Sequence, residues 1–299
     1  MNRRSAKRLL LGLVAALCLG AMALTIDPVR SFNALMPKDR ASARVAEGLA
    51  YGEGPRRTLD VYAPRASAGG ARPVIVFLYG GAWNSGHRQG YAFAGRALAA
   101  QGFVVVVPDY RLVPTVRYPD FLADCAAAVR WARTGVGRFG GDGNRIVLIG
   151  HSAGAYNAAM LALDPALLGT DRVAIRGFAG LAGPYDFLPL DDPATVAAFG
   201  RWPRLAESQP VHHAAAGAPP SLLLHGFDDD RVMPRHARAL AARLEAAGAR
   251  VELKYYPRLG HVGILAAVAI PFRRRAPVLA DVARFAREVT GDDGRGTPQ

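Results

Sequence analysis

A serine flanked by small residues lies between a predicted strand and a predicted helix. Residues 150–154 read Gly-His-Ser-Ala-Gly, after an apolar β-branched run at 145–149 and before a segment rich in helix formers at 155–163. In this context a G-x-S-x-G is typical of a nucleophile elbow, whose tight turn exposes the serine hydroxyl. The helix N-terminus behind that hydroxyl favours negative charge. A chance match in a Gly- and Ala-rich chain is the alternative, but the flanking elements favour Ser152 as a nucleophile.

The seven histidines supply the candidates for the base that such a serine needs. A hydroxyl is a weak nucleophile until a base accepts its proton, and with an elbow the order along the chain is Ser, then Asp or Glu, then His. His261 has glycines on both sides and follows a predicted strand at 251–256, so the backbone can present its imidazole at the sheet edge. His236 is expected to be a solvated residue at a helix start, and His225 a structural residue at a strand end. We therefore predict His261 to be the base.

Three adjacent aspartates follow the predicted strand that ends in His-Gly. Because adjacent carboxylates repel, we do not expect them to share one role. Asp229 fills the acidic position of an H-G-x-x-D-x-x-V pattern, with Asp228 and Asp230 in reserve and Asp186 as a remoter alternative. The acid would hold the second N–H of His261 and stabilise the imidazolium.

A second turn follows the predicted strand at 73–78, in the sequence Tyr-Gly-Gly-Ala-Trp at 79–83. Two glycines let the backbone curl so that successive N–H groups converge. We expect the N–H groups of Gly81, Ala82 and Ala153 to bind the oxygen of a tetrahedral intermediate, as an oxyanion hole does. Gly-Gly after a strand is also an ordinary turn. Its position one strand–helix–strand unit before the serine favours the functional interpretation.

Apolar strands alternate with helical patterns from about residue 55 onward. Strands are predicted at 58–62, 73–78, 103–107, 145–149, 173–181, 221–224 and 251–256, and helices at 90–101, 120–133, 155–163, 234–247 and 276–289. This alternation implies an α/β fold with a mostly parallel central sheet and helices on both faces. In such sheets ligand sites form at the carboxyl ends of the strands. We expect the domain to span 51–290, after a linker at 27–50 and before a disordered tail at 291–299.

The connection between the strands near 181 and 221 is long and has no clear strand of its own. Long connections inside compact domains are usually functional. We predict a small cap over the substrate pocket, with surface decoration as the alternative. The aromatic residues Trp83, Tyr185, Phe187 and Trp202 are the predicted pocket lining.

The N-terminus has the layout of an export segment. Four basic residues among the first eight precede an uncharged stretch that begins at Leu9. One interpretation is a secretory signal peptide with an A-x-A cleavage site at 21–23. The other is an uncleaved anchor, because the uncharged stretch 9–26 is just long enough to span a bilayer. From residues 1–26 we therefore predict that the following domain is exported. It would be periplasmic or secreted, or anchored to the inner membrane.

Composition excludes several other classes. The chain is 51% hydrophobic, which is ample for a large core, and its formal net charge of +13 comes mainly from scattered arginine. No basic stripe alternates with aromatic residues, so nucleic-acid binding is not expected, although attraction to an anionic membrane surface is possible. Beyond the N-terminal segment Cys125 is the only cysteine. The sequence shows no metal-ligand cluster, P-loop or dinucleotide-binding turn, so we expect no metal and no cofactor.

Together these motifs resemble the esterase/lipase branch of the α/β-hydrolase superfamily, particularly bacterial carboxylesterases with a Y/H-G-G-x-W oxyanion motif. Residues 108–112, Pro-Asp-Tyr-Arg-Leu, are similar to the segment after the fourth strand in that branch. Plant isoprenylcysteine methylesterases, kynurenine formamidases and feruloyl-esterase-like domains look related at the same motifs. Tyr79 stands where many relatives have histidine, and Ala82 where lipase-type members have a third glycine. Both differences leave the backbone donors in place.

The resemblance implies a serine hydrolase that cleaves small-molecule carboxylic esters through an acyl-enzyme on Ser152. An amidase, formamidase or peptidase would use the same three residues, and comparing an ester with its matched amide separates these activities. A non-catalytic, membrane-tethered binding module is the alternative outside enzymes. Such modules usually lose the serine or the histidine, and this chain has both.

Overall fold

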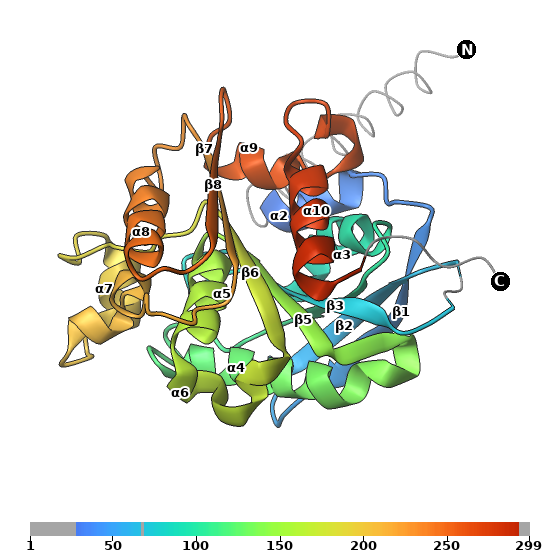
Figure 1. The fold of residues 1–299 in the computed structure, drawn as a ribbon, viewed down its shortest axis with the longest axis horizontal. Helices are drawn as coiled ribbons and strands as arrows, with labels where there is room; N and C mark the ends of the chain where they lie inside the picture. The colour runs from blue at the N-terminus through green and yellow to red at the C-terminus, as the bar shows by residue number, and fades with distance from the viewer. Residues whose placement is uncertain (1–27, 67–68, 293–299) are drawn as a thin grey trace, which may run out of the picture.

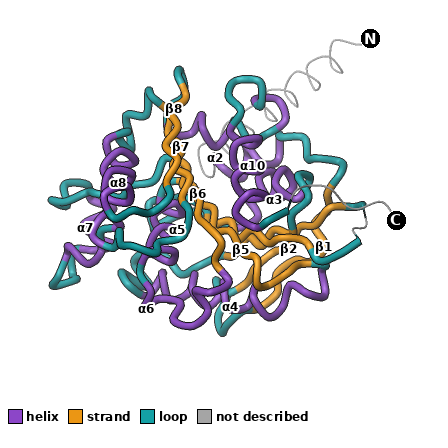
Figure 2. The backbone as a smooth tube through the Cα atoms, in the orientation of Figure 1, coloured by secondary structure: helices purple, strands orange, loops and turns teal. Residues whose placement is uncertain are grey.

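The computed structural model describes residues 28–66 and 69–292, which contain one eight-stranded sheet in the order β1-β2-β4-β3-β5-β6-β7-β8. Figure 2 shows the strands as a single twisted band that runs through the molecule. Strand β2 is antiparallel to both of its neighbours, and every other adjacent pair is parallel. The predicted mostly parallel sheet is therefore confirmed. The strands are β1 Ser42–Ala50, β2 Thr58–Pro64, β3 Arg72–Leu78, β4 Val104–Pro108, β5 Gly141–His151, β6 Ile175–Leu181, β7 Ser221–Gly226 and β8 Val251–Tyr256.

Helices cover both faces of this sheet, as predicted. In Figure 1, α3 and α10 lie together on one face, while α4, α5 and α6 lie on the other. Helix α8 packs against β7 and β8. The helices are α2 Pro28–Leu35, α3 Ala92–Ala99, α4 Asp120–Gly135, α5 Ala153–Leu163, α6 Pro165–Leu168, α7 Pro193–Phe199, α8 Arg235–Ala246, α9 His261–Ala266 and α10 Val278–Thr290.

The central elements are apolar because they are enclosed on every side. Strand β4 and residues 73–78 of β3 are fully buried, as expected for parallel strands with helices on both faces. Every residue of α5 is buried, and its apolar residues are not confined to one side. This buried centre holds β5 and α5 rigidly, and Ser152 lies at their junction.

The predicted linker at 27–50 is wrong for the residues that the structure describes. Strand β1 pairs with β2 and forms one edge of the sheet. Before it, α2 places Phe32 against Phe93 and Phe272, with ring centroids 5.1 and 6.1 Å apart. The alternation along β1 is weak because most of its side chains are partly or fully exposed and two irregularities interrupt the pairing. The domain therefore begins before residue 51.

The connection from β6 to β7 contains α7 and two short 3-10 helices, Leu205–Ser208 and Pro210–His212. It lies where the cap was predicted. Helix α10 ends at Thr290.

Within residues 28–66 and 69–292, no helix has the length and hydropathy needed to cross a bilayer. The predicted signal peptide or anchor at 1–26 lies outside the described residues, as do residues 293–299 of the predicted tail.

Candidate active site

The turn between β5 and α5 places Ser152 at the carboxyl edge of the sheet. Ser152 has φ 55° and ψ −125°, a strained backbone for a residue with a side chain. The turn is tight enough to exclude any side chain on its flanks. A Cβ on Gly150 would lie 2.1 Å from the carbonyl oxygen of Gly154, and one on Gly154 would lie 2.0 Å from that of Leu78. Both glycines are therefore required by close backbone approach.

A chain of hydrogen bonds joins the three residues that the sequence singles out. The Ser152 hydroxyl and the Nε2 atom of His261 are 2.9 Å apart, and Nδ1 of His261 is 2.9 Å from Oδ2 of Asp229. In this arrangement the hydroxyl donates to Nε2, and the Nδ1–H group donates to the carboxylate. The sequence predicts a loop at His261, but the structure places this residue at the start of α9.

Asp229 is the only one of its three adjacent aspartates that faces the interior. Asp228 and Asp230 are exposed, whereas Asp229 is 2% exposed. Its Oδ1 atom accepts hydrogen bonds from the backbone N–H groups of Val232, at 2.9 Å, and Arg231, at 3.1 Å. The alternative acid, Asp186, is exposed and has no contact with His261 among the hydrogen bonds of the described chain.

The charge of this carboxylate is stabilised in place. Burial raises the pKa of Asp229, but hydrogen bonds from His225, His261 and the Val232 N–H group outweigh it and hold the pKa well below its usual range. The carboxylate is therefore ionised at neutral pH and can stabilise a positive charge on His261.

Two further histidines support the chain, and sequence reasoning gave neither of them a role in the site. His225 is fully buried; its Nε2 lies 2.7 Å from the Val232 carbonyl oxygen and 3.3 Å from Oδ2 of Asp229. His151 donates from Nε2 to the carbonyl oxygen of His261 at 3.0 Å. Burial, and then the nearby His261, lowers the pKa of His151 to about 3, so its ring is neutral. The sequence carries a signal for each of them. His225 belongs to the His-Gly pair that precedes the acid, and His151 is the residue directly before the serine.

The turn after β3 has an unusual backbone. Gly81, Ala82 and Trp83 have φ values of 133°, 49° and 58°, so two residues with side chains adopt the left-handed region. Such strain costs on the order of 1 kcal/mol or more per residue and persists where the surroundings enforce it. Ala82 and Ala153 line the same cavity as Ser152, whereas Gly81 is not among the lining residues. The first N–H groups of α5, including that of Ala153, have no acceptor within their own helix.

Buried tyrosines fix this turn through its carbonyl groups. The Tyr110 hydroxyl donates to the carbonyl oxygen of Tyr79 at 2.8 Å, and the Tyr91 hydroxyl to that of Gly80 at 3.2 Å. The Tyr79 hydroxyl donates to Asp109 at 2.7 Å. Asp109 and Tyr110 of the 108–112 motif therefore hold the turn in place through hydrogen bonds.

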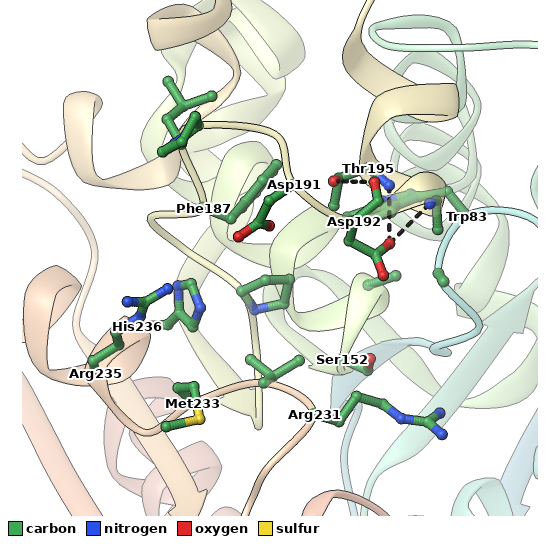
Figure 3. Close-up of a pocket in the computed structure, with 17 residues that line it drawn as sticks. Trp83, Ser152, Phe187, Asp191, Asp192, Thr195, Arg231, Met233, Arg235 and His236 are labelled. Atoms are coloured by element: carbon green, nitrogen blue, oxygen red, sulfur yellow. Dashed lines mark hydrogen bonds between the residues drawn. The ribbon is translucent and has the colours of Figure 1, made fainter.

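A cavity of about 710 Å³ lies against Ser152 and has two walls (Figure 3). We call the lining residues from 82–83 and 152–153 the serine wall, and those from 184–195 and 233–236 the cap wall. Arg231 and Val232 complete the lining. Among the predicted pocket residues, Trp83 and Phe187 line this cavity.

The other two predicted lining residues are placed elsewhere. Tyr185 is fully buried with its hydroxyl beneath Gly180 and Gly183, and Trp202 packs edge-on against Tyr118 at 5.1 Å. The prediction for His236 is also wrong. Its side chain is not solvated but 6% exposed, and it lines the cap wall. The helix-start pattern does not show which face of α8 meets the cap.

Among the described residues, no group of three or more His, Cys, Asp or Glu side chains could hold a metal ion.

The strand order, with β2 reversed and an elbow between β5 and α5, defines an α/β-hydrolase fold. Solved esterases share it. Inhibited esterase B from Lactobacillus rhamnosis superposes with a TM-score of 0.77 over 93% of this chain and 96% of that one, at 22% identity. Butyrate-bound esterase Est2 from Thermogutta terrifontis gives 0.69 over 84% and 96%, at 25% identity.

The BD-FAE family model matches residues 59–244, so the chain belongs to the BD-FAE family. Esterase LipC from Mycobacterium tuberculosis is 34% identical over 71% of this chain, and isoprenylcysteine alpha-carbonyl methylesterase ICME from Arabidopsis thaliana is 30% identical over 75%. This chain spans 58% of the length of each of these two relatives.

Proposed function

We propose that this protein is a serine carboxylesterase that acts on small-molecule esters without a cofactor. The hydrogen-bonded chain from Ser152 through His261 to Asp229 carries the proposal, because it connects a nucleophile, a base and an ionised acid in the order that acyl transfer needs. The esterase relatives support the same class of reaction.

The reaction begins when Ser152 attacks the ester carbonyl and His261 accepts the hydroxyl proton. Asp229 stabilises the imidazolium that forms. Negative charge develops on the carbonyl oxygen, and the N–H groups of Gly81, Ala82 and Ala153 are assigned to bind it. His261 then protonates the departing alcohol, which leaves an acyl group on Ser152.

Water completes the cycle. His261 accepts a proton from water as it attacks the acyl group, and the second tetrahedral intermediate collapses to release the acid and regenerate the Ser152 hydroxyl. The cavity beside Ser152 holds the part of the substrate that extends from the reacting carbonyl.

The Ser152→Ala variant tests this proposal. In a comparable triad the loss of the serine lowers kcat by about 10⁶. We expect kcat for short-chain esters, followed in a pH-stat, to fall by a factor of this order, while the circular dichroism spectrum stays unchanged. Ester hydrolysis near the wild-type rate would reject the assignment. Faster cleavage of a matched amide than of the ester would reject the esterase class and keep the site.

We also propose that residues 1–26 export the domain, either as a cleaved signal or as an inner-membrane anchor. The support is the basic start followed by the uncharged stretch 9–26. A fusion of residues 1–30 to a periplasm-dependent phosphatase reporter should be active in bacteria, and the mass of the mature protein separates cleavage from anchoring. An inactive reporter, with the fusion present in the cytoplasm, would contradict export.

A further inference from the structure

The cap wall presents a side-chain hydrogen-bond donor that has no partner among the described residues. The Nδ1 atom of His236 accepts the backbone N–H of Asp186 at 3.3 Å. Burial, followed by the charge of Arg235, lowers the pKa of His236 to about 4, so the ring is neutral and its proton lies on Nε2. Within the described chain Nε2 has no hydrogen-bond partner, although the residue is only 6% exposed and lines the cavity.

Two arginines that line the same cavity also lack a carboxylate partner among the described residues. Arg235 and Arg231 form no ion pair with any carboxylate among the described residues, and both line the cavity. Figure 3 shows Arg235 beside His236 on one side of the cavity and Arg231 on the side of Ser152. The Arg231 backbone is held by its N–H bond to Asp229 at 3.1 Å, so its place relative to the proposed catalytic residues is fixed.

The start of α8 adds to this positive character. Arg235 is the first residue of this twelve-residue helix, which has no acidic residue in its first turn and no side-chain cap. The N–H groups of a helix N-terminus carry partial positive charge and favour anions nearby. The Nε2–H group, the guanidinium and the helix end therefore favour the same kind of ligand atom, a negatively charged oxygen.

Acidic residues of the cap wall oppose this effect only in part. Asp192 accepts hydrogen bonds from the N–H groups of Ala194 and Thr195, at 2.8 and 3.3 Å, and so caps α7. Its charge is used within the protein. Asp191 is the remaining carboxylate of this lining. Asp186, whose charge acts on His236, lines a smaller neighbouring pocket with the exposed Arg235 and is a second opposing carboxylate. These two carboxylates face two unpaired guanidinium groups, the Nε2–H group of His236 and the start of α8.

We propose that Arg235 and His236 bind a carboxylate carried by the substrate, so that the preferred substrates are anionic esters. The ester carbonyl lies at Ser152 and the carboxylate at the opposite wall. This class includes half-esters of dicarboxylic acids, with the charge on the acyl side, and acyl esters of hydroxy acids, with the charge on the alcohol side. The inference rests on the proposed esterase function.

Two matched pairs of esters test this substrate class in a pH-stat at pH 7.5. Monomethyl adipate is compared with methyl hexanoate, and 6-acetoxyhexanoate with hexyl acetate, so that each pair isolates the charge on one side of the ester. We expect the anionic ester of at least one pair to have a kcat/KM about tenfold higher than its neutral partner. Because the interaction is between charges, this selectivity should decline when the salt concentration is raised from 0.05 to 0.5 M, concentrations at which screening becomes strong.

Variants of the cap wall separate the carboxylate site from general effects. Arg235→Gln and His236→Phe should each lower the anionic-to-neutral ratio of kcat/KM about tenfold, mainly through KM. His236→Gln, which restores an N–H donor, should recover much of the ratio. Arg238→Gln is the control, because Arg238 is an exposed arginine of the same helix that does not line the cavity, and it should leave the ratio unchanged.

The outcomes distinguish this inference from the proposed function. Neutral esters cleaved at least as well as anionic ones, in a reaction that needs Ser152, would overturn the carboxylate site and keep the esterase. A ratio that Arg235→Gln does not change, or a preference for cationic esters abolished by Asp191→Asn, would overturn it equally. If none of the four esters is cleaved in a Ser152-dependent reaction, the proposed function fails and this inference fails with it.

Discussion

The serine wall is shaped by backbone that has no room to change, whereas the cap wall is shaped by side chains on irregular chain. On the serine wall, Ala82 and Trp83 adopt the left-handed region, and directly behind it the backbone leaves no room for a Cβ on Gly150 or Gly154. On the cap wall, Phe187 and His236 come from a connection and a helix start that meet only in the folded protein. In our proposal, turn geometry therefore sets the reaction chemistry, and side chains that can be replaced without moving the backbone set the choice of substrate.

After the loss of Ser152 itself, the largest effect should come from the acid behind the serine wall. Asp229→Asn is expected to lower kcat about 10⁴-fold, because an amide cannot stabilise the imidazolium and favours the wrong tautomer. Its matched control is Asp228→Asn, an exposed neighbour that should keep at least half of the wild-type kcat. Steady-state kinetics on a short-chain ester give both values. If Asp229→Asn kept a normal rate while Asp228→Asn was inactive, the catalytic acid would have to be assigned to Asp228 instead.

The backbone character of the serine wall is tested by Gly154→Ala. The new Cβ would lie 2.0 Å from the Leu78 carbonyl oxygen, so the backbone must move. We expect the free energy of unfolding to fall by more than ~3 kcal/mol, measured with urea. Gly137→Ala is the control, because a Cβ there meets nothing within 4 Å. Equal stability of the two variants would show that the elbow tolerates a side chain.

His151, next to Ser152, and His236, on the cap wall, are both buried and neutral, and both should make stability depend on pH. Burial lowers the pKa of His151 to about 3 and of His236 to about 4. Below its ordinary pKa of about 6.5, the unfolded histidine binds a proton that the folded ring does not. The free energy of unfolding should therefore fall as pH decreases from 6.5, by about 2 kcal/mol per ring at pH 5.

Urea titrations at pH 7, 6 and 5 measure this slope. The His236→Gln variant should have a shallower slope by the contribution of one ring. A wild-type stability that is constant between pH 7 and pH 5 would mean that these rings are protonated in the folded protein.

A smaller effect is expected at His225, which acts through Asp229 and is a positioning residue. Its Nε2–H group bonds the Val232 carbonyl and approaches the carboxylate at 3.3 Å. His225→Phe should lower kcat about tenfold, the value of one hydrogen bond to a charged group, with little change in KM. His225→Gln retains an N–H donor and should recover part of the loss. A kcat unaffected by His225→Phe would remove this residue from the site.

The smallest effect should come from the cap wall, where Phe187→Ala enlarges the cavity without touching the reacting atoms. We expect KM for short-chain esters to rise a few-fold while kcat changes less, measured over a series of acyl lengths. The comparison variant is Tyr185→Phe, since the Tyr185 hydroxyl is buried without a partner and does not line the cavity. Its KM should equal that of the wild type, and its free energy of unfolding should be unchanged or slightly higher. If Phe187→Ala lowered kcat as much as Asp229→Asn does, the two walls would not differ in their roles.

Prediction from sequence succeeds on the serine wall for the same reason that the wall is rigid. A turn with no room for a Cβ at positions 150 and 154 must contain glycine at both, so its geometry is visible in the residue types. Alternating strands and helices likewise reveal the sheet. The proximity of Ser152, His261 and Asp229 follows from both.

Prediction fails where long-range packing decides. Strand β1 is half-exposed and irregular, so residues 42–50 show little period and the sequence predicts a linker there. An aromatic residue within the cap has the same local sequence signal whether it faces the cavity, as Phe187 does, or the core, as Tyr185 does. His236 is buried by the β6–β7 connection, which its own helix pattern cannot show.

The most direct test of the central claim is the site of covalent labelling by a fluorophosphonate, which reacts with a serine only when a base activates it. Intact-mass spectrometry should show one phosphonyl group per folded chain, and peptide mapping should place it on Ser152. Labelling should disappear in His261→Ala and after denaturation. A folded wild-type chain that stays unlabelled, or that carries the group on another serine, would contradict the account.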